Sequence, residues 1–246
     1  MRIDKEIQME LFPAIDIINK NVVRLFKGDY DRMTIYSDSP LETAIGFEKC
    51  GAANLHVVDL DGAKNGTTEN FDVIRDIAEN TGLFIEVGGG IRNEERIKRY
   101  IDCGVGRVIL GSVAVENPDF VSEMTEKYGE KIAVGVDAKD GFVAIHGWKT
   151  ISHVDSVEFC RDMQKRGVKT VIYTDISKDG AMSGTNLDIY RLLCGIEGLD
   201  IVASGGITYY RELEELRVLG IYGAILGKAL YTGAIDLKRA IEENKR

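Results

Sequence analysis

Short apolar runs alternate with longer amphipathic segments along the chain. The apolar runs are LFPAID, LHVVDL, LFIEVGG, RVILGS, KIAVGVD, TVIYTDI, IVASGG and GAILGK. Such short, nearly all-apolar runs are typical of parallel strands buried on both faces. The predicted helices span residues 40–51, 70–82, 93–105, 117–129, 153–167, 186–198, 209–220 and 236–245. Several begin at Asn or Pro and end before Gly, as helix caps should. Eight strand–helix units predict a closed barrel or a doubly wound sheet.

An internal repeat favours the barrel. The motif VGGGI recurs as ASGGI, and VILGS recurs as AILGK. Gly206 lies 116 residues after Gly90, and Gly227 lies 116 residues after Gly111. A shared offset between separate motifs indicates two equivalent halves of four units each. We therefore predict a (β/α)8 TIM barrel built from two duplicated half-barrels, which suits a chain of 246 residues.

Composition limits the classes of partner and compartment. The net charge of −9 argues against a nucleic-acid partner, and no apolar run approaches the ~20 residues of a membrane span. The first nine residues, MRIDKEIQM, lack the apolar stretch of a signal peptide. We interpret residues 1–9 as an N-terminal extension and residues 10–246 as one domain, and we expect a cytoplasmic monomer. The four cysteines and three histidines form no zinc-spaced cluster, so no metal site is predicted.

Two glycine-rich clusters follow the predicted strands in equivalent positions. In a barrel the carboxyl ends of the strands form the active face, and the loops after strands seven and eight form a common phosphate site. Glycine lets the backbone approach an anion and point N–H groups at it. Because the repeat supplies a second copy after strands three and four, we predict a small-molecule substrate with a phosphate at each end, unless one copy is vestigial. The predicted phosphate-binding residues are Gly89, Gly90, Gly111 and Ser112 in the first cluster and Gly205, Gly206, Gly227 and Lys228 in the second.

Two aspartates stand at matched strand ends. Asp16 ends the first strand and Asp137 the fifth, and these strands face each other across an eight-stranded barrel. A proton shift needs one group that accepts a proton and another that donates one. An ordinary Asp, with a pKa of ~3.9, can be the base, whereas the acid needs a pKa raised by desolvation. Spacing alone leaves open which is the acid, and each aspartate could instead cap a helix or bond loop amides.

Further candidates surround the end of the sixth strand. Thr174 and Asp175 are adjacent in sequence, so their side chains point to opposite faces of the strand. Asp175 shares its repeat position with Asp59, so we interpret both aspartates as structural and Thr174 as a hydrogen-bond donor in the pocket. Asp179 lies in the following loop, where it could contact the substrate or shape the turn before Gly180.

The first and fifth loops carry one candidate each. Trp148, the only tryptophan, could stack on a planar heterocycle or pack within its loop. Arg24 could pair with a phosphate or remain a solvated surface charge. His56 and His146 lie in apolar runs and are interpreted as core groups. No histidine pairs with an evident Ser or Cys nucleophile, so a hydrolase triad is unsupported.

Together these motifs resemble the barrel family of histidine biosynthesis that contains the ProFAR isomerases. The resemblance covers the chain from Glu10 onward, and its motifs are FPAIDI, VVRLFKGDY, LHVVDLDGA, VGGGIR, LGSVAVENP, VGVDAKDG, the GW pair, YTDISKDG, ASGGI and LGKALY. It implies an aldose–ketose isomerase that performs an Amadori rearrangement on a bis-phosphoribosyl imidazole carboxamide, with no metal or organic cofactor.

The resemblance also implies roles for individual residues. Asp16 would be the general base and Asp137 the general acid. Thr174 and Asp179 fall at substrate-contacting positions of the family, and Trp148 at the position that stacks on the heterocycle. Ala181 stands where many members have Thr, which puts one loop contact in doubt.

Three alternatives remain open at the level of sequence. The cyclase subunit of imidazole glycerol phosphate synthase shares the aspartates and the duplicated phosphate sites, but it usually lacks the GW pair and the Arg of the first loop. A bifunctional isomerase would also act on phosphoribosyl anthranilate. A non-catalytic barrel would bind a bis-phosphate without needing an acid–base pair.

Overall fold

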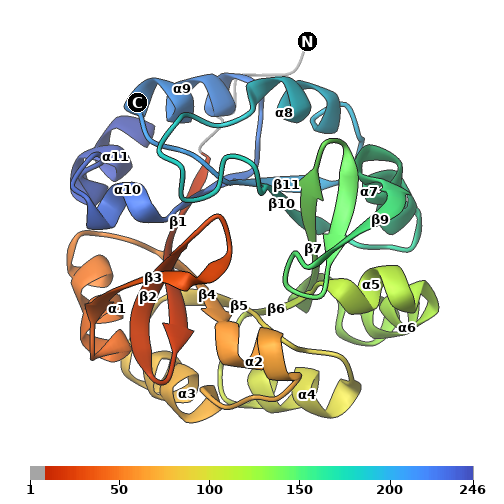
Figure 1. Ribbon diagram of the computed structural model, residues 1–246, viewed down its shortest axis with the longest axis horizontal. Coiled ribbons are helices and arrows are strands. Elements are labelled where there is room, and N and C mark those ends of the chain that lie inside the picture. Colours follow the sequence, from red (N-terminus) through yellow and green to blue (C-terminus); the bar gives the residue numbers. More distant parts are fainter. Residues whose placement is uncertain (1–8, 246) are drawn as a thin grey trace.

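Eight parallel strands form a closed barrel in the computed structural model, which describes residues 9–245 (Figure 1). Strand β12 pairs with β1, and β10 pairs with β7, so the sheet closes on itself. The barrel strands are β1 (Glu10–Ile18), β4 (Asn54–Asp59), β5 (Phe84–Gly88), β6 (Arg107–Leu110), β7 (Ile132–Lys139), β10 (Thr170–Asp175), β11 (Asp200–Ser204) and β12 (Gly223–Leu226). The predicted TIM barrel is confirmed.

The predicted helices surround the barrel (Figure 1). They are α1 (Pro40–Lys49), α3 (Phe71–Asn80), α4 (Glu94–Asp102), α6 (Pro118–Tyr128), α7 (Ser156–Lys165), α8 (Leu187–Leu193), α9 (Tyr210–Val218) and α11 (Leu237–Asn244). The asparagine caps form as expected at Asn93 and Asn117, whose side chains accept hydrogen bonds from the backbone N–H groups of Arg96 and Phe120. The predicted start of the fifth helix at residue 153 is wrong, because His153 belongs to a strand, β9.

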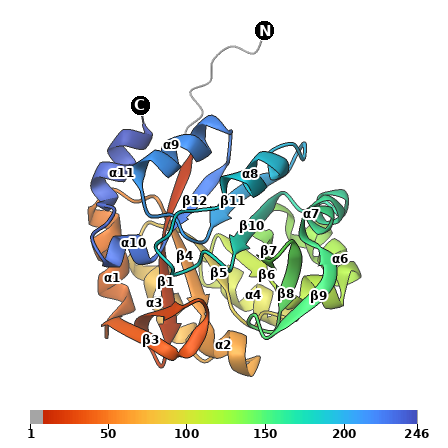
Figure 2. The same cartoon turned by 45° about the horizontal axis from the view of Figure 1, so that its top comes forward.

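Two antiparallel hairpins extend the first strand of each half-barrel. Strands β2 (Asn21–Phe26) and β3 (Asp29–Ser37) follow β1, and strands β8 (Phe142–Ile145) and β9 (Thr150–Asp155) follow β7. The short elements α2 (Leu60–Asn65), α5 (Ser112–Glu116), α10 (Lys228–Tyr231) and the 3-10 turn η1 (Gly129–Lys131) complete the fold. Figure 2 shows both hairpins at the same end of the barrel, which is the lower end in that view. Because β2 and β8 continue from the carboxyl ends of β1 and β7, they help to wall the mouth at that end.

The two main apolar clusters lie on either side of the barrel wall, and a small third one, formed by Ile18, Val23 and Leu25, lies at the first hairpin. A large cluster fills the space between the barrel and its helices, and a smaller one fills the barrel interior. The interior cluster consists of Phe12, Ala14, Ile109, Ala133, Ile172, Val202 and Ile225. Inward and outward side chains alternate along each strand, so the inward residues beyond this plug, toward the strand ends, form the floor and walls of an open mouth.

The expected N-terminal extension lies outside the described residues except for Met9. Met9 is buried, and its carbonyl oxygen accepts a hydrogen bond from the side chain of Asn244 near the other end of the chain. Among the helices within residues 9–245, none combines the length and apolar character needed to cross a membrane. The same residues contain no cluster of three or more His, Cys, Asp or Glu side chains arranged to hold a metal ion.

Candidate active site

A cavity of about 260 Å3 opens at the carboxyl ends of the barrel strands. The predicted site residues lie near the carboxyl ends of the barrel strands, or in the hairpins, loops and short helices that follow these strands. The predicted residues that line it are Asp16, Arg24, Gly89, Gly90, Gly111, Ser112, Asp137, Trp148, Thr174, Asp179, Gly205, Gly206, Gly227 and Lys228. The sequence-based selection therefore converges on one cavity.

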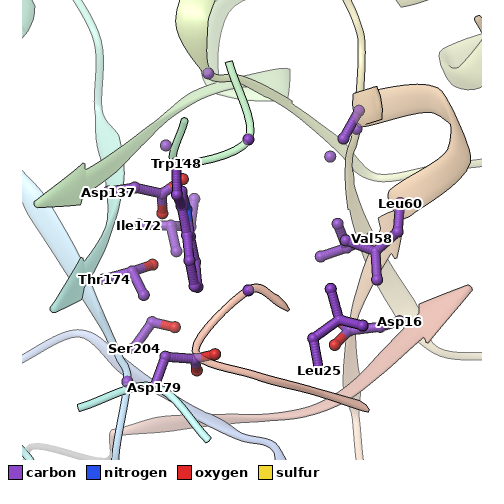
Figure 3. A pocket seen from close by; sticks show the side chains of 18 of the residues that line it. Asp16, Leu25, Val58, Leu60, Asp137, Trp148, Ile172, Thr174, Asp179 and Ser204 are labelled. Carbon is purple, nitrogen blue, oxygen red and sulfur yellow. The ribbon is translucent and has the colours of Figure 1, made fainter. Parts of the chain in front are cut away.

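Asp16 and Asp137 lie on opposite walls of this cavity (Figure 3). Asp16 belongs to β1 and forms an ion pair with Arg24, with 2.8 Å between Oδ2 and Nη1. A second hydrogen bond, 2.5 Å long, runs from Arg24 Nη2 to the carbonyl oxygen of Ala14. Burial acts to lower the pKa of Arg24, but the surrounding negative charge, led by Asp16, raises it overall. Arg24 is therefore a cation fixed beside the first catalytic candidate.

Asp137 occupies a drier environment on β7. Burial raises the pKa of its carboxyl group, while hydrogen bonds from Trp148 and Thr174 and the charge of His56 act in the opposite direction. Thr174 is its strand neighbour on β10, and Figure 3 shows the indole of Trp148 beside it. A carboxyl group whose pKa is raised by desolvation is suited to hold a proton for donation.

Asp179 is a third carboxyl group near the same space. It lies in the loop after β10, and burial followed by the negative charge of Asp16 raises its pKa to about 6, although Arg24 acts to lower it. Figure 3 places its side chain on the same wall as Thr174 and Ser204. The loop that holds it packs on the first loop, because a Cβ at Gly180 would lie 2.8 Å from the carbonyl oxygen of Leu25.

The two glycine clusters have matching backbone geometry. Gly111 has φ −96° and ψ −111°, and its equivalent Gly227 has φ −102° and ψ −113°. Gly89 and Gly205 both have positive φ, and a Cβ on either would approach the carbonyl oxygen of the equivalent strand-end aspartate, at 2.2 Å from Asp59 and 2.6 Å from Asp175. Only glycine fits such a close approach. Figure 1 places α5 and α10, which follow Gly111 and Gly227, on opposite sides of the barrel.

Asp59 and Asp175 are structural, as predicted. Asp59 Oδ1 accepts hydrogen bonds from Gly62 N at 2.8 Å and from Asn70 Nδ2 at 2.7 Å. Asp175 Oδ2 accepts one from Asn186 Nδ2 at 2.8 Å, and its Oδ1 binds the backbone and hydroxyl of Ser177. These aspartates shape the loops behind the two glycine clusters instead of facing the cavity.

Cationic and polar side chains accompany each cluster. In the second cluster the Lys228 ammonium donates a hydrogen bond of 3.0 Å to the carbonyl oxygen of Gly180. In the first cluster the Ser112 hydroxyl accepts one of 2.8 Å from the backbone N–H of His146. Arg92 also lines the cavity, and the sequence analysis did not select it. Its position directly after the VGGGI motif was the available signal.

The two histidine interpretations have different outcomes. His146 is not a core group: its side chain is 44% exposed and its Nε2 lies 2.6 Å from Glu116 Oε1. His56 is buried and forms a hydrogen bond, as expected, but it also lines the cavity.

Trp148 packs directly against the first loop, because a Cβ at Gly28 would lie 2.3 Å from its ring.

Comparison with known proteins adds the following findings. The family model described as histidine biosynthesis protein matches residues 10–236. A protein of Brachyspira hyodysenteriae is 53% identical over 97% of this chain and 100% of its own length. Relatives from Clostridioides difficile and Dehalococcoides mccartyi are 47% and 48% identical, over 94% and 96% of this chain and 97% and 99% of their own lengths. All three are named as isomerases of an imidazole-4-carboxamide that carries a phosphoribosyl group and a (phosphoribosylamino)methylideneamino group.

Proposed function

The chain belongs to the histidine biosynthesis protein family, and we propose that it isomerises the aminoaldose ProFAR to the aminoketose PRFAR. The reaction is an aldose–ketose isomerisation of the Amadori type. The observation that carries this proposal is the placement of Asp16 and Asp137 on opposite walls of one cavity, between two glycine clusters of matching geometry. A substrate with a phosphate at each end would span the clusters and present its central ribose to both carboxyl groups.

The environments of the two aspartates support a division of roles. Asp137 is desolvated, and its raised pKa suits a group that donates a proton to the furanose ring oxygen. The bond between that oxygen and C1′ then breaks as the nitrogen lone pair forms the Schiff base. Asp16, paired with the Arg24 guanidinium, is an anion suited to remove the C2′ proton. The electrons of the C–H bond form an enolamine, which tautomerises to the ketose.

Arg24 connects the base to the second glycine cluster. A Cβ at Gly227 would lie only 3.3 Å from the central carbon of the guanidinium. The cation therefore stands between the Asp16 carboxylate and the predicted phosphate position. We propose that Arg24 orients Asp16 and also attracts the phosphate, which extends the phosphate role expected from the sequence.

Trp148 is proposed to stack on the imidazole ring of the substrate. Its indole borders the cavity beside Asp137, where a flat heterocycle would reach it. Trp148→Ala should weaken substrate binding by about tenfold, as expected for the loss of a single stacking contact of ~1–1.5 kcal/mol. The measurement is KM together with calorimetric affinity for the product, and unchanged affinity would eliminate stacking.

The main experiment is a spectrophotometric isomerase assay of the purified chain with ProFAR. Phosphoribosyl anthranilate is tested in parallel, and activity on both substrates would favour the bifunctional alternative. Cyclase activity on PRFAR with added ammonia would favour the sister enzyme, whereas binding without turnover would favour a non-catalytic barrel. The names of the relatives and the presence of Arg24 and Trp148 in the cavity support the isomerase.

We also propose that the enzyme acts as a cytoplasmic monomer without an organic cofactor or metal. The cavity is formed by residues of a single barrel, so a second copy is not needed to complete it. Light scattering during size-exclusion chromatography would test the mass, expected near the 27.2 kDa of one chain. Full activity after dialysis against a chelator is the expected result for metal independence.

A further inference from the structure

A chain of ionisable side chains lies inside the barrel below the cavity. His56 Nδ1 lies 2.7 Å from Glu86 Oε1, and Arg107 binds the other carboxylate oxygen of Glu86 at 2.6 Å through Nη2 and 3.1 Å through Nε. Arg107 Nη1 donates a further hydrogen bond of 3.0 Å to Thr170 Oγ1. His56, Glu86 and Arg107 occupy directly paired positions on β4, β5 and β6, so their side chains share one face of the sheet.

The second half-barrel, as far as the structure describes it, has no such chain of ionisable side chains. The residues 116 positions after His56, Glu86 and Arg107 are Ile172, Val202 and Gly223. The barrel interior therefore packs with apolar or small residues at the equivalent places, and Ile172 and Val202 belong to its apolar cluster. Burying charges requires desolvation, and an apolar filling of similar volume is often at least as stable. Packing alone does not explain why one half keeps three ionisable groups.

His56 connects this chain to the cavity. The Glu86 carboxylate is fully buried, and although burial acts to raise its pKa, the hydrogen bond from His56 and the charges of His56 and Arg107 lower it. Glu86 is therefore an anion that accepts the Nδ1–H of His56, which fixes the orientation of the ring. The side chain of His56 lines the cavity, and its Nε2 has no hydrogen-bond partner within residues 9–245.

The equivalent residue in the other half shows what His56 adds. Ile172 also lines the cavity, so the two halves contribute one polar and one apolar residue at this level. The charge of His56 also acts on Asp137, where it opposes the rise in pKa caused by burial. His56 is thus placed to act on the reacting part of a substrate between the two aspartates.

We propose that His56 is a further substrate-contacting residue of the isomerisation, whose Nε2 hydrogen-bonds the reacting ribose from the cavity floor while Glu86 and Arg107 act as positioning residues. This inference rests on the proposed function. On this proposal, Glu86 and Arg107 support His56 in the site. This explains why these ionisable side chains occur only in the half-barrel that carries His56.

Two substitutions separate the functional role from a structural one. His56→Asn keeps an amide near Nδ1, where it can still bind Glu86, but it removes the Nε2 position. His56→Gln places its amide near Nε2 and gives up the bond to Glu86. If Nε2 contacts the substrate, His56→Asn should lower kcat by roughly 10- to 100-fold with little change in KM, since the loss of a strong hydrogen bond has about this effect. His56→Gln should retain more activity.

A purely structural role predicts the opposite order. His56→Asn would then keep wild-type turnover, His56→Gln would be the poorer enzyme, and either result would overturn the proposal. Thermal unfolding of both variants is measured alongside. If the wild-type chain itself does not isomerise ProFAR, the proposed function fails. If the wild type is active and His56→Asn matches it, only the role of His56 fails.

A measurement on the unmodified chain covers the case in which the variants do not fold. The chain has three histidines, so 15N-labelled histidine gives a spectrum simple enough to assign. Addition of the product should shift the Nε2 resonance of His56, because a new hydrogen bond changes the environment of that nitrogen. An unchanged Nε2 resonance at saturating product would overturn the inference.

Discussion

The two aspartates differ in what surrounds them, and that difference makes their roles testable. Asp16→Asn removes the proposed base and Asp137→Asn removes the proposed acid, while both replacements keep the shape of the side chain. We expect each to lower kcat by ~100-fold or more, the usual scale for an acid–base group. Product affinity, measured by calorimetry, should remain because the glycine clusters are unchanged. Wild-type turnover in either variant would remove that residue from the mechanism.

Asp179 should make the stability of the chain depend on pH. Its pKa is raised to about 6 in the folded chain, against ~3.9 in an unfolded one. Between these values the folded state binds more protons, so the free energy of unfolding falls as pH rises from about 4 to 6. Asp179→Asn should not show this loss, so its free energy of unfolding should rise relative to that of wild type by on the order of 1 kcal/mol between pH 4 and pH 7. One pKa unit corresponds to ~1.4 kcal/mol, and the full effect is not expected because the side chain is only partly buried.

Chemical denaturation at the two pH values measures this difference. Asp31→Asn, at an exposed position of β3, is the matched control for removing a carboxylate without burial. An equal pH response in wild type and Asp179→Asn would show that Asp179 titrates normally.

Individual residues could be predicted where a strand end or a repeat fixed their place. Asp16, Asp137 and Thr174 reach the cavity because they lie close to the carboxyl ends of barrel strands. The cavity position of His56 was not predicted, for a physical reason. A barrel strand is buried on both faces, so the run LHVVDL shows no polar alternation that separates the barrel interior from the helix-facing side. The pairing of His56 with Glu86 joins residues 30 positions apart, which the local pattern does not contain.

At the scale of elements, the strand-to-helix loops depend on glycine for a specific contact. A Cβ at Gly205 would lie 2.6 Å from the carbonyl oxygen of Asp175, and Gly205 has φ +93°. Gly205→Ala should therefore destabilise the chain by roughly 1–3 kcal/mol and weaken phosphate binding at the second cluster. Gly51 provides a matched control, because it has φ +96° with no atom within 4 Å of an added Cβ. The difference in unfolding free energy between the two variants isolates the steric contact.

The sequence predicted the barrel strands and the outer helices but not the two hairpins. The barrel strands and outer helices follow strong apolar patterns, and all were predicted. The hairpins β2–β3 and β8–β9 were interpreted as loops, because most positions of β3 and β9 are exposed and carry no buried stripe. Their stability comes from antiparallel pairing with β1 and β7, and such pairing depends on residues in another strand.

At the scale of the molecule, the two half-barrels are similar in backbone and different in chemistry. The glycine clusters match in φ and ψ, and the aspartate–asparagine pairs behind them match in sequence spacing. The asymmetry lies between the clusters: the hairpins present different residues, Arg24 and Trp148, the aspartate environments differ, and only one half has the ionisable side chains under His56. We therefore propose that a symmetric frame binds the two similar ends of the substrate, and that its asymmetric centre distinguishes acid from base.

This division predicts two anion sites in each chain. Inorganic phosphate should bind with a stoichiometry of two and compete with the substrate, as measured by calorimetry and by inhibition of the isomerase. Ser112→Ala should weaken the site after β6, and Lys228→Ala should weaken the site after β12. A ligand that joins two phosphates at the right separation should bind about 100-fold or more tightly than a fragment with one, because its second contact forms at a high effective concentration. Binding of a single phosphate per chain would mean that one cluster is vestigial, and the match of Gly111 with Gly227 would then be a relic of duplication without a present role in binding.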